Sequence, residues 1–147
     1  MASKDTVFDS PRDWVNTHIK EYVKTDGKKG HDWNGVPTLL LTTRGRKSGK
    51  LRRTALIYGR DGKNYLIVAS HGGAPRHPQW YLNLVENPAV QLQVGAEKFA
   101  AKARTATPKE KPRLWKLMSE LFPRYDLYKE EAAKAKRVIP LVILEPV

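Results

Sequence analysis

Positively charged side chains gather in one short stretch of this sequence, TTRGRKSGKLRRT at residues 42–54, which contains no acidic residue. Six of its thirteen residues are cationic: Arg44, Arg46, Lys47, Lys50, Arg52 and Arg53. Guanidinium and ammonium groups, together with the backbone N–H groups of a glycine-containing turn, bind phosphate and carboxylate groups. The stretch therefore suits an anionic partner, whether a nucleic acid, a membrane surface or a small polyanion. The simpler alternative is a solvated basic hairpin, because charge runs usually lie on exposed surfaces.

The distribution of charge along the chain favours a binding site over a uniformly basic surface. The 147 residues carry a formal net charge of +12. Between Trp33 and Val85, nine Lys or Arg accompany a single acid, Asp61, whereas both ends of the chain mix the two signs. Charge that serves only solubility has no reason to concentrate in the middle of a sequence.

Side chains that commonly carry out catalysis are scarce. The four histidines, His18, His31, His71 and His77, lack the spacing of metal ligands, so we expect no bound metal. The sequence has no cysteine, which excludes disulfides, Fe–S clusters and cysteine-bound zinc. Neither a Ser-His-Asp grouping nor a pair of catalytic carboxylates stands out. If the protein is an enzyme, we expect a bound cofactor to supply the reactive chemistry.

Two tyrosines near the C-terminus are the remaining candidates for chemistry. Tyr125 and Tyr128 lie about one helical turn apart, after the segment LFPR. Aromatic residues at this spacing usually pack against a core. The functional interpretation is a phenol that lines a pocket and donates a hydrogen bond to a substrate carbonyl. Among the histidines, His71 and His77 bracket a glycine-containing loop and are better placed for ligand contact than His18, which lies on an apolar helix face.

Periodicity and turn signals predict the elements that must position these residues. We predict helices at residues 10–23, 78–88, 108–122 and 125–136, and strands at residues 36–43, 53–60, 63–70, 89–94, 97–107 and 138–147. Asp61-Gly62 and Gly95 mark tight turns, and Thr107 with Glu110 forms a capping box. Strands joined by hairpins, with helices between them and at the ends, indicate an α+β fold with an antiparallel sheet. Because the last strand must pair inside that sheet, we expect a small barrel.

The length suits a single domain, in which residues 1–30 form an N-terminal amphipathic helix and linker and residues 31–147 form the main body. No apolar run approaches the roughly 20 residues that span a bilayer, and the first ten residues, MASKDTVFDS, lack the apolar segment that is typical of a secretory signal. Without cysteines, the simplest location is a reducing cytoplasm. The apolar stripe of Trp14, Ile19, Tyr22 and Val23 suits either a membrane surface or, more often, packing against the sheet.

Three segments in combination resemble a known family. They are LLLTTRGRKSGKLRRTALIY, YLIVASHGGAPRHPQWYLNLVENPAVQLQV and ELFPRYDLYKEEAAKAKRVIPLVILEP. They resemble the deazaflavin (coenzyme F420)-dependent nitroreductases, actinobacterial oxidoreductases that also act as quinone reductases. The resemblance implies a split β-barrel, an FMN-binding-like antiparallel barrel with flanking helices, and reduced F420 as hydride donor. F420 carries a phosphodiester and an oligoglutamate tail, so it is a small polyanion that suits the basic stretch.

The resemblance also implies which residues form the site. Arg46, Lys47 and Ser48 hold the phosphate and tail, and Arg52, Arg53, Thr54, Ala55, Leu56 and Ile57 run along the cofactor. The cofactor cleft is completed by Val68, Ala69, Ser70, His71, Gln79, Trp80, Tyr81, Leu82 and Asn83. Tyr125 lies near the deazaflavin ring, and the catalytic candidates are Tyr125, Tyr128 and Ser70.

The implied reaction transfers a hydride from reduced F420 to a quinone, a nitroaromatic compound or an activated enone. The sequence departs from the family pattern at His71, where lysine is common, and at Phe122, where tyrosine occurs, so the acceptor stays open. Other functional classes are a basic nucleic-acid-binding module and a split barrel that holds FMN or haem without turnover. Against nucleic acid, Tyr65, Trp80 and Tyr81 are embedded in apolar patterns and are not interleaved with the cations. The oligomeric state is also open.

Overall fold

The computed structural model describes residues 7–9, 13–33 and 35–147 of the chain. Its strands are β1 (Val7–Asp9), β2 (Asp32–Trp33), β3 (Val36–Arg44), β4 (Leu51–Ile57), β5 (Gly59–Asp61), β6 (Asn64–Val68), β7 (Ala89–Val94), β8 (Glu97–Thr105) and β9 (Leu141–Pro146). Its helices are α1 (Asp13–Lys24), α2 (Gln79–Glu86), α3 (Lys111–Leu121) and α4 (Arg124–Lys134), with a single 3₁₀ turn, η1 (His71–Gly73). No helix in these ranges is long and apolar enough to cross a bilayer.

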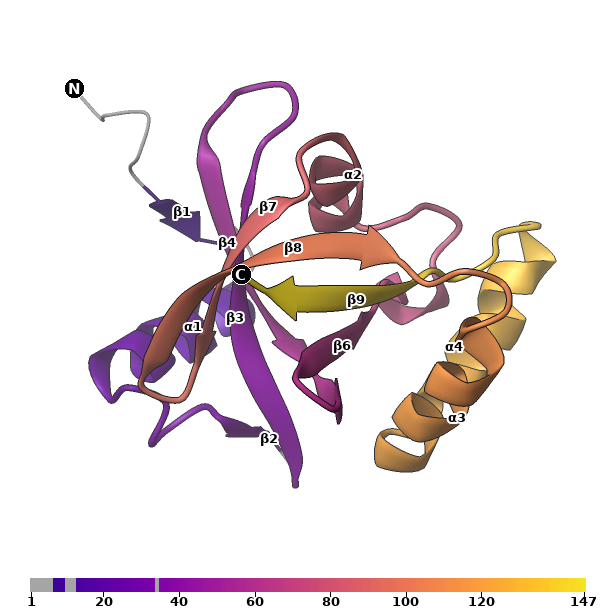
Figure 1. Ribbon diagram of the computed structural model, residues 1–147, viewed down its shortest axis with the longest axis horizontal. Coiled ribbons are helices and arrows are strands. Elements are labelled where there is room, and N and C mark those ends of the chain that lie inside the picture. The colour runs from indigo at the N-terminus through magenta and orange to yellow at the C-terminus, as the bar shows by residue number, and fades with distance from the viewer. Residues whose placement is uncertain (1–6, 10–12, 34) are drawn as a thin grey trace.

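The strands form one strongly curled sheet in the order β1-β4-β3-β7-β8-β9-β6-β5, with β2 paired to β3 (Figure 1). The β1–β4 pair is parallel, and the other pairs among the described strands are antiparallel. β4 and β5 are separated only by Tyr58, yet β4 pairs with β3 and β5 pairs with β6. This bent segment therefore connects the two ends of the sheet and closes it into a split β-barrel, as the resemblance implied.

Alternation along the strands sorts side chains between the barrel interior and the outer layers. Leu39 and Leu41 of β3 lie in the interior core, whereas Leu40 between them packs beneath α1. On β6, Ile67 faces the interior, while Leu66 and Val68 on either side of it pack outward against α3 and α4. The barrel wall is therefore buried on both faces along these strands, which explains why their sequences are almost continuously apolar.

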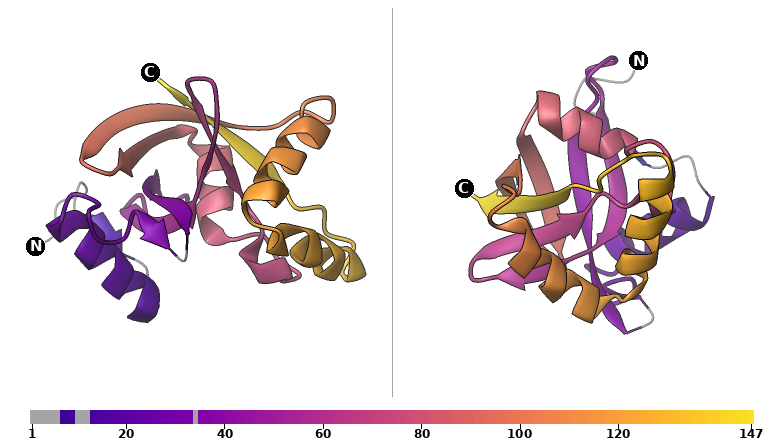
Figure 2. Two further views of the ribbon diagram at one scale, coloured as in Figure 1. Left: turned by 90° about the horizontal axis from the view of Figure 1, so that it is seen from below. Right: turned by 90° about the vertical axis from the view of Figure 1, so that its right-hand side faces the viewer.

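The helices cover separate parts of the barrel. α3 and α4 lie side by side at one end, where they cover the outer face of β6 and β9 (Figures 1 and 2). α1 packs on the outside of β3, with Ile19 and Tyr22 fully buried. The Tyr22 hydroxyl fixes this contact because it accepts a hydrogen bond from the Gly95 N–H at 2.7 Å and donates one to the Thr38 carbonyl at 3.1 Å. The apolar stripe of α1 is thus used within the protein, as far as its described side chains show.

The predicted elements are present, with differences that have physical causes. The Thr107–Glu110 capping box forms with both of its reciprocal hydrogen bonds, although the helix predicted from residue 108 begins three residues later, at Lys111. The predicted strand 53–60 begins earlier, at residue 51, and breaks at Tyr58, because its two halves pair with different neighbours. The short strands β1 and β2 were not predicted, since sequences this short form strands only when a partner strand is present. Residues 10–12, the predicted start of the first helix, lie outside the described ranges.

Candidate functional site

A cleft of about 940 Å³ opens along β4, between the β3–β4 turn, α2 and the α3–α4 hairpin. Most residues named from the resemblance line it: Arg46, Lys47, Ser48, Arg52, Arg53, Thr54, Ala55, Leu56, Ile57, Val68, Ser70, His71, Gln79, Trp80, Asn83, Tyr125 and Tyr128. The fold therefore brings segments that lie far apart in the sequence into one cavity.

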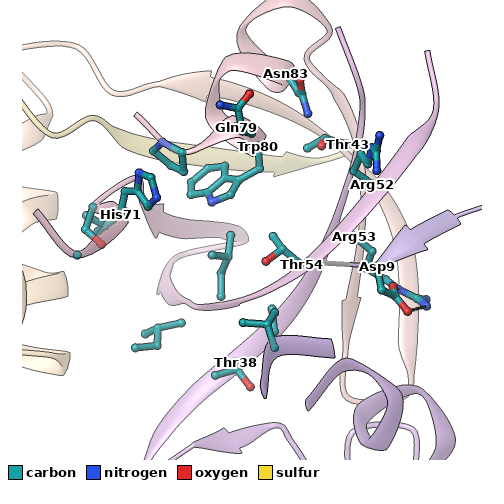
Figure 3. A pocket seen from close by; sticks show the side chains of 18 of the residues that line it. Asp9, Thr38, Thr43, Arg52, Arg53, Thr54, His71, Gln79, Trp80 and Asn83 are labelled. Atoms are coloured by element: carbon teal, nitrogen blue, oxygen red, sulfur yellow. Dashed lines mark hydrogen bonds and ion pairs between the residues drawn. The ribbon is translucent and has the colours of Figure 1, made fainter. Parts of the chain in front are cut away.

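Three of the named residues lie outside the lining of this cleft. Helical spacing places Gln79, Trp80 and Asn83 on the α2 face that projects toward the cleft (Figure 3). Tyr81 lies on another face, where its hydroxyl is 2.8 Å from the Thr105 hydroxyl, and Leu82 is also directed away. Ala69 is fully buried in the layer beneath. Strand alternation and helix periodicity thus turn the side chains of Ala69, Tyr81 and Leu82 away from the cleft, and their assignment to the cofactor stays a prediction.

One end of the cleft is cationic and is built by the β3–β4 turn. The turn is closed by hydrogen bonds from the Gly45 N–H to the Lys50 carbonyl at 2.7 Å and from the Gly49 N–H to the Gly45 carbonyl at 2.8 Å. Gly49 adopts a φ of 72°, in the left-handed region that favours glycine. This conformation exposes Lys47 and Ser48 at the tip of the turn. Their side chains are available to an anionic ligand.

Arg46 is held in place by α2. Its guanidinium donates hydrogen bonds to Asn83 Oδ1 and to Gln79 Oε1, each at 2.8 Å. Its backbone N–H also donates to Asn83 Oδ1, at 3.2 Å. Both acceptors are neutral amides, so they orient the guanidinium without cancelling its positive charge. The sequence named all three residues but gave no sign that they contact one another.

Arg53 is paired with an acid that sequence proximity did not reveal. β1 lies beside β4 with Asp9 opposite Arg53, and the two side chains form a bidentate ion pair at 2.6 and 3.2 Å (Figure 3). Asp9 itself lines the cleft. Residues 42–54 contain no acidic residue, but the fold brings Asp9 from β1 against Arg53. Because this carboxylate neutralises the guanidinium, Arg53 contributes less positive charge to the cleft than we expected.

A buried hydroxyl adds a polar group near the cationic end. Thr43 is 1% exposed and lines the cleft, opposite Arg52 in the β3–β4 register (Figure 3). Its Oγ1 has no hydrogen-bond partner among the residues that the structure describes. A buried polar atom without a partner is costly, so a bound ligand or ordered water is the natural partner for it. Nothing in the sequence distinguished Thr43 from the other threonines of the strand.

The other end of the cleft is aromatic. Tyr125 is buried, its ring packs edge-on against Phe122 at 5.0 Å, and it also contacts Tyr128. Burial raises the pKa of Tyr125 well above its ordinary value of 10.0, so the phenol stays protonated and remains a hydrogen-bond donor at physiological pH. Trp33 reaches Phe122 from β2, with ring centroids 6.3 Å apart. The sequence did not single out Trp33, because this contact is made only in the folded chain.

The histidines make hydrogen bonds and do not gather around a common point. The His18 ring stacks on Tyr22 with ring centroids 6.4 Å apart, its Nε2 lies 2.6 Å from the Gly30 carbonyl oxygen, and the residue also lines the cleft. His31 Nε2 lies 2.8 Å from the Tyr58 hydroxyl, and His71 Nδ1 lies 3.0 Å from the Arg76 carbonyl. Within the described ranges no three His, Asp or Glu side chains are arranged to hold a metal ion.

The fold and the cleft together define a class: a split-barrel protein in which one cleft joins a cationic end to an aromatic end. Such a cleft suits a ligand that is anionic at one end and flat at the other. Sequence comparison then identifies the family. The chain belongs to the F420H(2)-dependent quinone reductase family, whose model matches residues 14–146.

Individual relatives agree with this assignment. A Mycobacterium tuberculosis protein named as an F420H(2)-dependent quinone reductase is 42% identical over 133 residues, which cover 88% of each chain. A solved structure of an F420-H2 dependent reductase matches with a TM-score of 0.67 and 39% identity, covering 74% of this chain and 94% of its own. A second structure, described as a domain-swapped dimer, matches with a TM-score of 0.70 and 37% identity, covering 92% of this chain and all (100%) of its own.

Proposed function

We propose that this protein is an F420H2-dependent reductase that transfers a hydride from the reduced deazaflavin to a quinone. Family membership supports the proposal. The observation that carries it is the joining of the two ends in one cleft: Arg46, oriented by neutral amides, lies at one end, and the protonated phenol of Tyr125 lies at the other.

The residues present fit the cofactor that the family name implies. Arg46, Lys47 and Ser48 would hold its phosphate and acidic tail, and the Thr43 hydroxyl, which has no hydrogen-bond partner among the described residues, lines the same cleft as a further donor. Several cations converging on a polyanion give salt-dependent binding that a single exposed ion pair does not supply. Trp80 and the β4 side chains from Thr54 to Ile57 offer a largely apolar wall to the ring system. When bound, reduced F420 supplies the hydride.

The chain itself orients the acceptor and controls protons. Tyr125 is placed to donate a hydrogen bond to an acceptor oxygen, and its raised pKa keeps that proton available. Tyr128, whose ring contacts that of Tyr125, and Ser70 line the same cleft as further donors. Phe122 and Trp33 narrow the aromatic end without adding a hydroxyl. A flat acceptor with carbonyl oxygens fits this combination, and quinones have that form. Nitroaromatic compounds and activated enones are also flat and polar, and we include them as secondary acceptors.

The proposed partners are therefore small molecules, and the proposed location is the cytoplasm. The stripe of α1 that suggested membrane contact contains Ile19 and Tyr22, both fully buried, so a peripheral membrane role has little support from this helix. The division of the single domain into an N-terminal segment, residues 1–30, and a main body, residues 31–147, stays a prediction. In the structure, α1 packs directly on the barrel. The dimer among the related structures makes size-exclusion chromatography with light scattering the appropriate test of oligomeric state.

Two assays test the function. Fluorescence titration of the purified protein with F420 and with FMN, at two salt concentrations, should show F420 binding that weakens with salt and little binding of FMN. Consumption of reduced F420 should then depend on an added quinone. Tight FMN binding without F420 binding would favour the alternative of an FMN-binding barrel. Binding of neither cofactor, combined with tight binding of nucleic acid, would favour the basic nucleic-acid-binding module.

A further inference from the structure

A buried arginine outside the cleft lining contacts the loop that carries the candidate residues Ala69, Ser70 and His71. Arg137 follows α4 and is 8% exposed. Its Nε donates to the Ala74 carbonyl at 2.8 Å, its Nη1 to the Ala69 carbonyl at 3.1 Å, and its Nη2 to the Ser70 carbonyl. Its Nη1 also lies 2.8 Å from His77 Nδ1. One guanidinium thus binds the loop at residues 69, 70, 74 and 77.

No carboxylate belongs to this arrangement. None of the ion pairs found among the described residues includes Arg137. A buried charge is unfavourable unless hydrogen bonds satisfy it, and here backbone carbonyls and an imidazole do so. Because arginine has no acceptor atom, His77 Nδ1 must be unprotonated to accept from it. The arrangement therefore requires a neutral His77 and fixes the tautomer of its ring.

The loop has a conformation that needs such support. His71, Gly72 and Gly73 have consecutive φ values of 50°, 61° and 80°. The left-handed region costs a residue with a side chain about 1–2 kcal/mol, so contacts from outside the turn stabilise His71 in this conformation. Within the turn, the Gly73 N–H donates to the Ser70 carbonyl at 2.9 Å and the Ala74 N–H to the His71 carbonyl at 3.0 Å. In this conformation Ser70 and His71 line the cleft.

The backbone of Arg137 is itself fixed by the end of α4. The Lys136 N–H donates to the Ala133 carbonyl at 2.9 Å and the Arg137 N–H to the Ala132 carbonyl at 3.0 Å, the hydrogen-bond pair of a Schellman motif. The loop also packs on α4 directly, because a Cβ atom added to Gly73 would lie only 2.8 Å from the Glu131 Cβ. The loop and α4 therefore form one unit.

We propose that Arg137 is a positioning residue, whose guanidinium holds the 69–77 loop in the shape that presents Ser70 and His71 to the cleft. The proposal rests on the proposed function in one respect, since the wall that Arg137 shapes belongs to the cleft proposed to hold reduced cofactor and acceptor. Arg137 itself does not line that cleft. Its effect on turnover passes through the loop.

The first test follows the loop without any ligand. Hydrogen–deuterium exchange of the full chain should show the amides of Gly73 and Ala74 exchanging about tenfold faster in Arg137→Ala, while the β7–β8 amides keep their protection. Arg137→Lys keeps the charge but cannot bind four acceptors at once, so it should give a smaller increase. If Arg137→Ala does not fold, the exchange measurement is made on Arg137→Lys instead. Arg113→Lys is the matched control, because Arg113 is exposed and pairs with Asp61 away from the cleft.

The second test uses chemical rescue. Guanidinium chloride at millimolar concentration should restore both loop protection and quinone turnover in Arg137→Ala, whereas sodium chloride at equal ionic strength should not. Loop exchange equal to wild type in both variants would overturn the proposal, and so would a loss of protection throughout the barrel. Because the exchange measurement needs no cofactor, a wild-type protein that bound no F420 would refute the proposed function while leaving the loop result to be judged separately.

Discussion

Replacing Arg46 with alanine is the most direct test of how the cationic end of the cleft works. Arg46 is already oriented by hydrogen bonds from its guanidinium to Asn83 and Gln79, both at 2.8 Å. Binding an anion therefore costs little side-chain entropy at this position. Its two partners are uncharged, so the full positive charge is available to a phosphate or carboxylate.

The expected loss of affinity follows from one charge-assisted hydrogen bond. Such a bond contributes about 1.5–3 kcal/mol, and each 1.4 kcal/mol corresponds to about a tenfold change in Kd. We therefore expect Arg46→Ala to weaken F420 binding by about tenfold to about a hundredfold at low salt. The difference from wild type should shrink as salt is added, because the Debye length falls from about 10 Å at 0.1 M to about 3 Å at 1 M.

The assay is a fluorescence titration with F420 at several salt concentrations, accompanied by thermal unfolding of each variant. Arg113→Ala is the matched control, because it removes the same charge from an exposed ion pair with Asp61 outside the cleft lining. Lys47→Ala should give a smaller loss than Arg46→Ala, because Lys47 is exposed at the tip of the turn. If Arg46→Ala bound F420 as tightly as the Arg113 control does, the anion-binding end would be placed wrongly.

Three further perturbations test other parts of the structure. Tyr125→Phe should lower quinone turnover more than F420 affinity, because it removes only the phenol proton; the opposite order in steady-state kinetics and titration would reject that role. Lys136→Gly should raise the melting temperature by about 2–4 °C, since Lys136 has a φ of 59° at the end of α4 and relief of left-handed strain stabilises by about 1 kcal/mol. Burial, and secondarily the charge of Arg137, lowers the pKa of His77 below 6.5, so protonation disfavours the folded state. The neutral His77 ring should therefore contribute fully to the free energy of unfolding above pH 6.5, and this contribution should decline as the pH falls from 6.5 toward the lowered pKa of the folded state. Denaturant unfolding at several pH values should show a shallower decline of the free energy of unfolding for His77→Asn than for wild type.

Much of the fold followed from local signals. The Asp61-Gly62 and Gly95 turns, the alternation in residues 89–94 and the capping box at Thr107 are short-range patterns, and each produced the predicted element. The break at Tyr58 did not follow from such signals, because it depends on which neighbour each half of the segment pairs with. Pairing between distant strands is set by the whole sheet.

The sequence by itself determined the composition of the site: an excess of cations in the middle of the chain, few catalytic acids, and motifs specific enough to indicate a cofactor-dependent reductase. Only the tertiary structure decided how those residues act. It placed Asp9 on Arg53, gave Arg46 its neutral partners, turned Tyr81 away from the cleft and made Arg137 the support of a distant loop. The physical reason is that residue type and spacing set what a side chain is able to do. Its charge, protonation and orientation depend on neighbours that come from other parts of the chain.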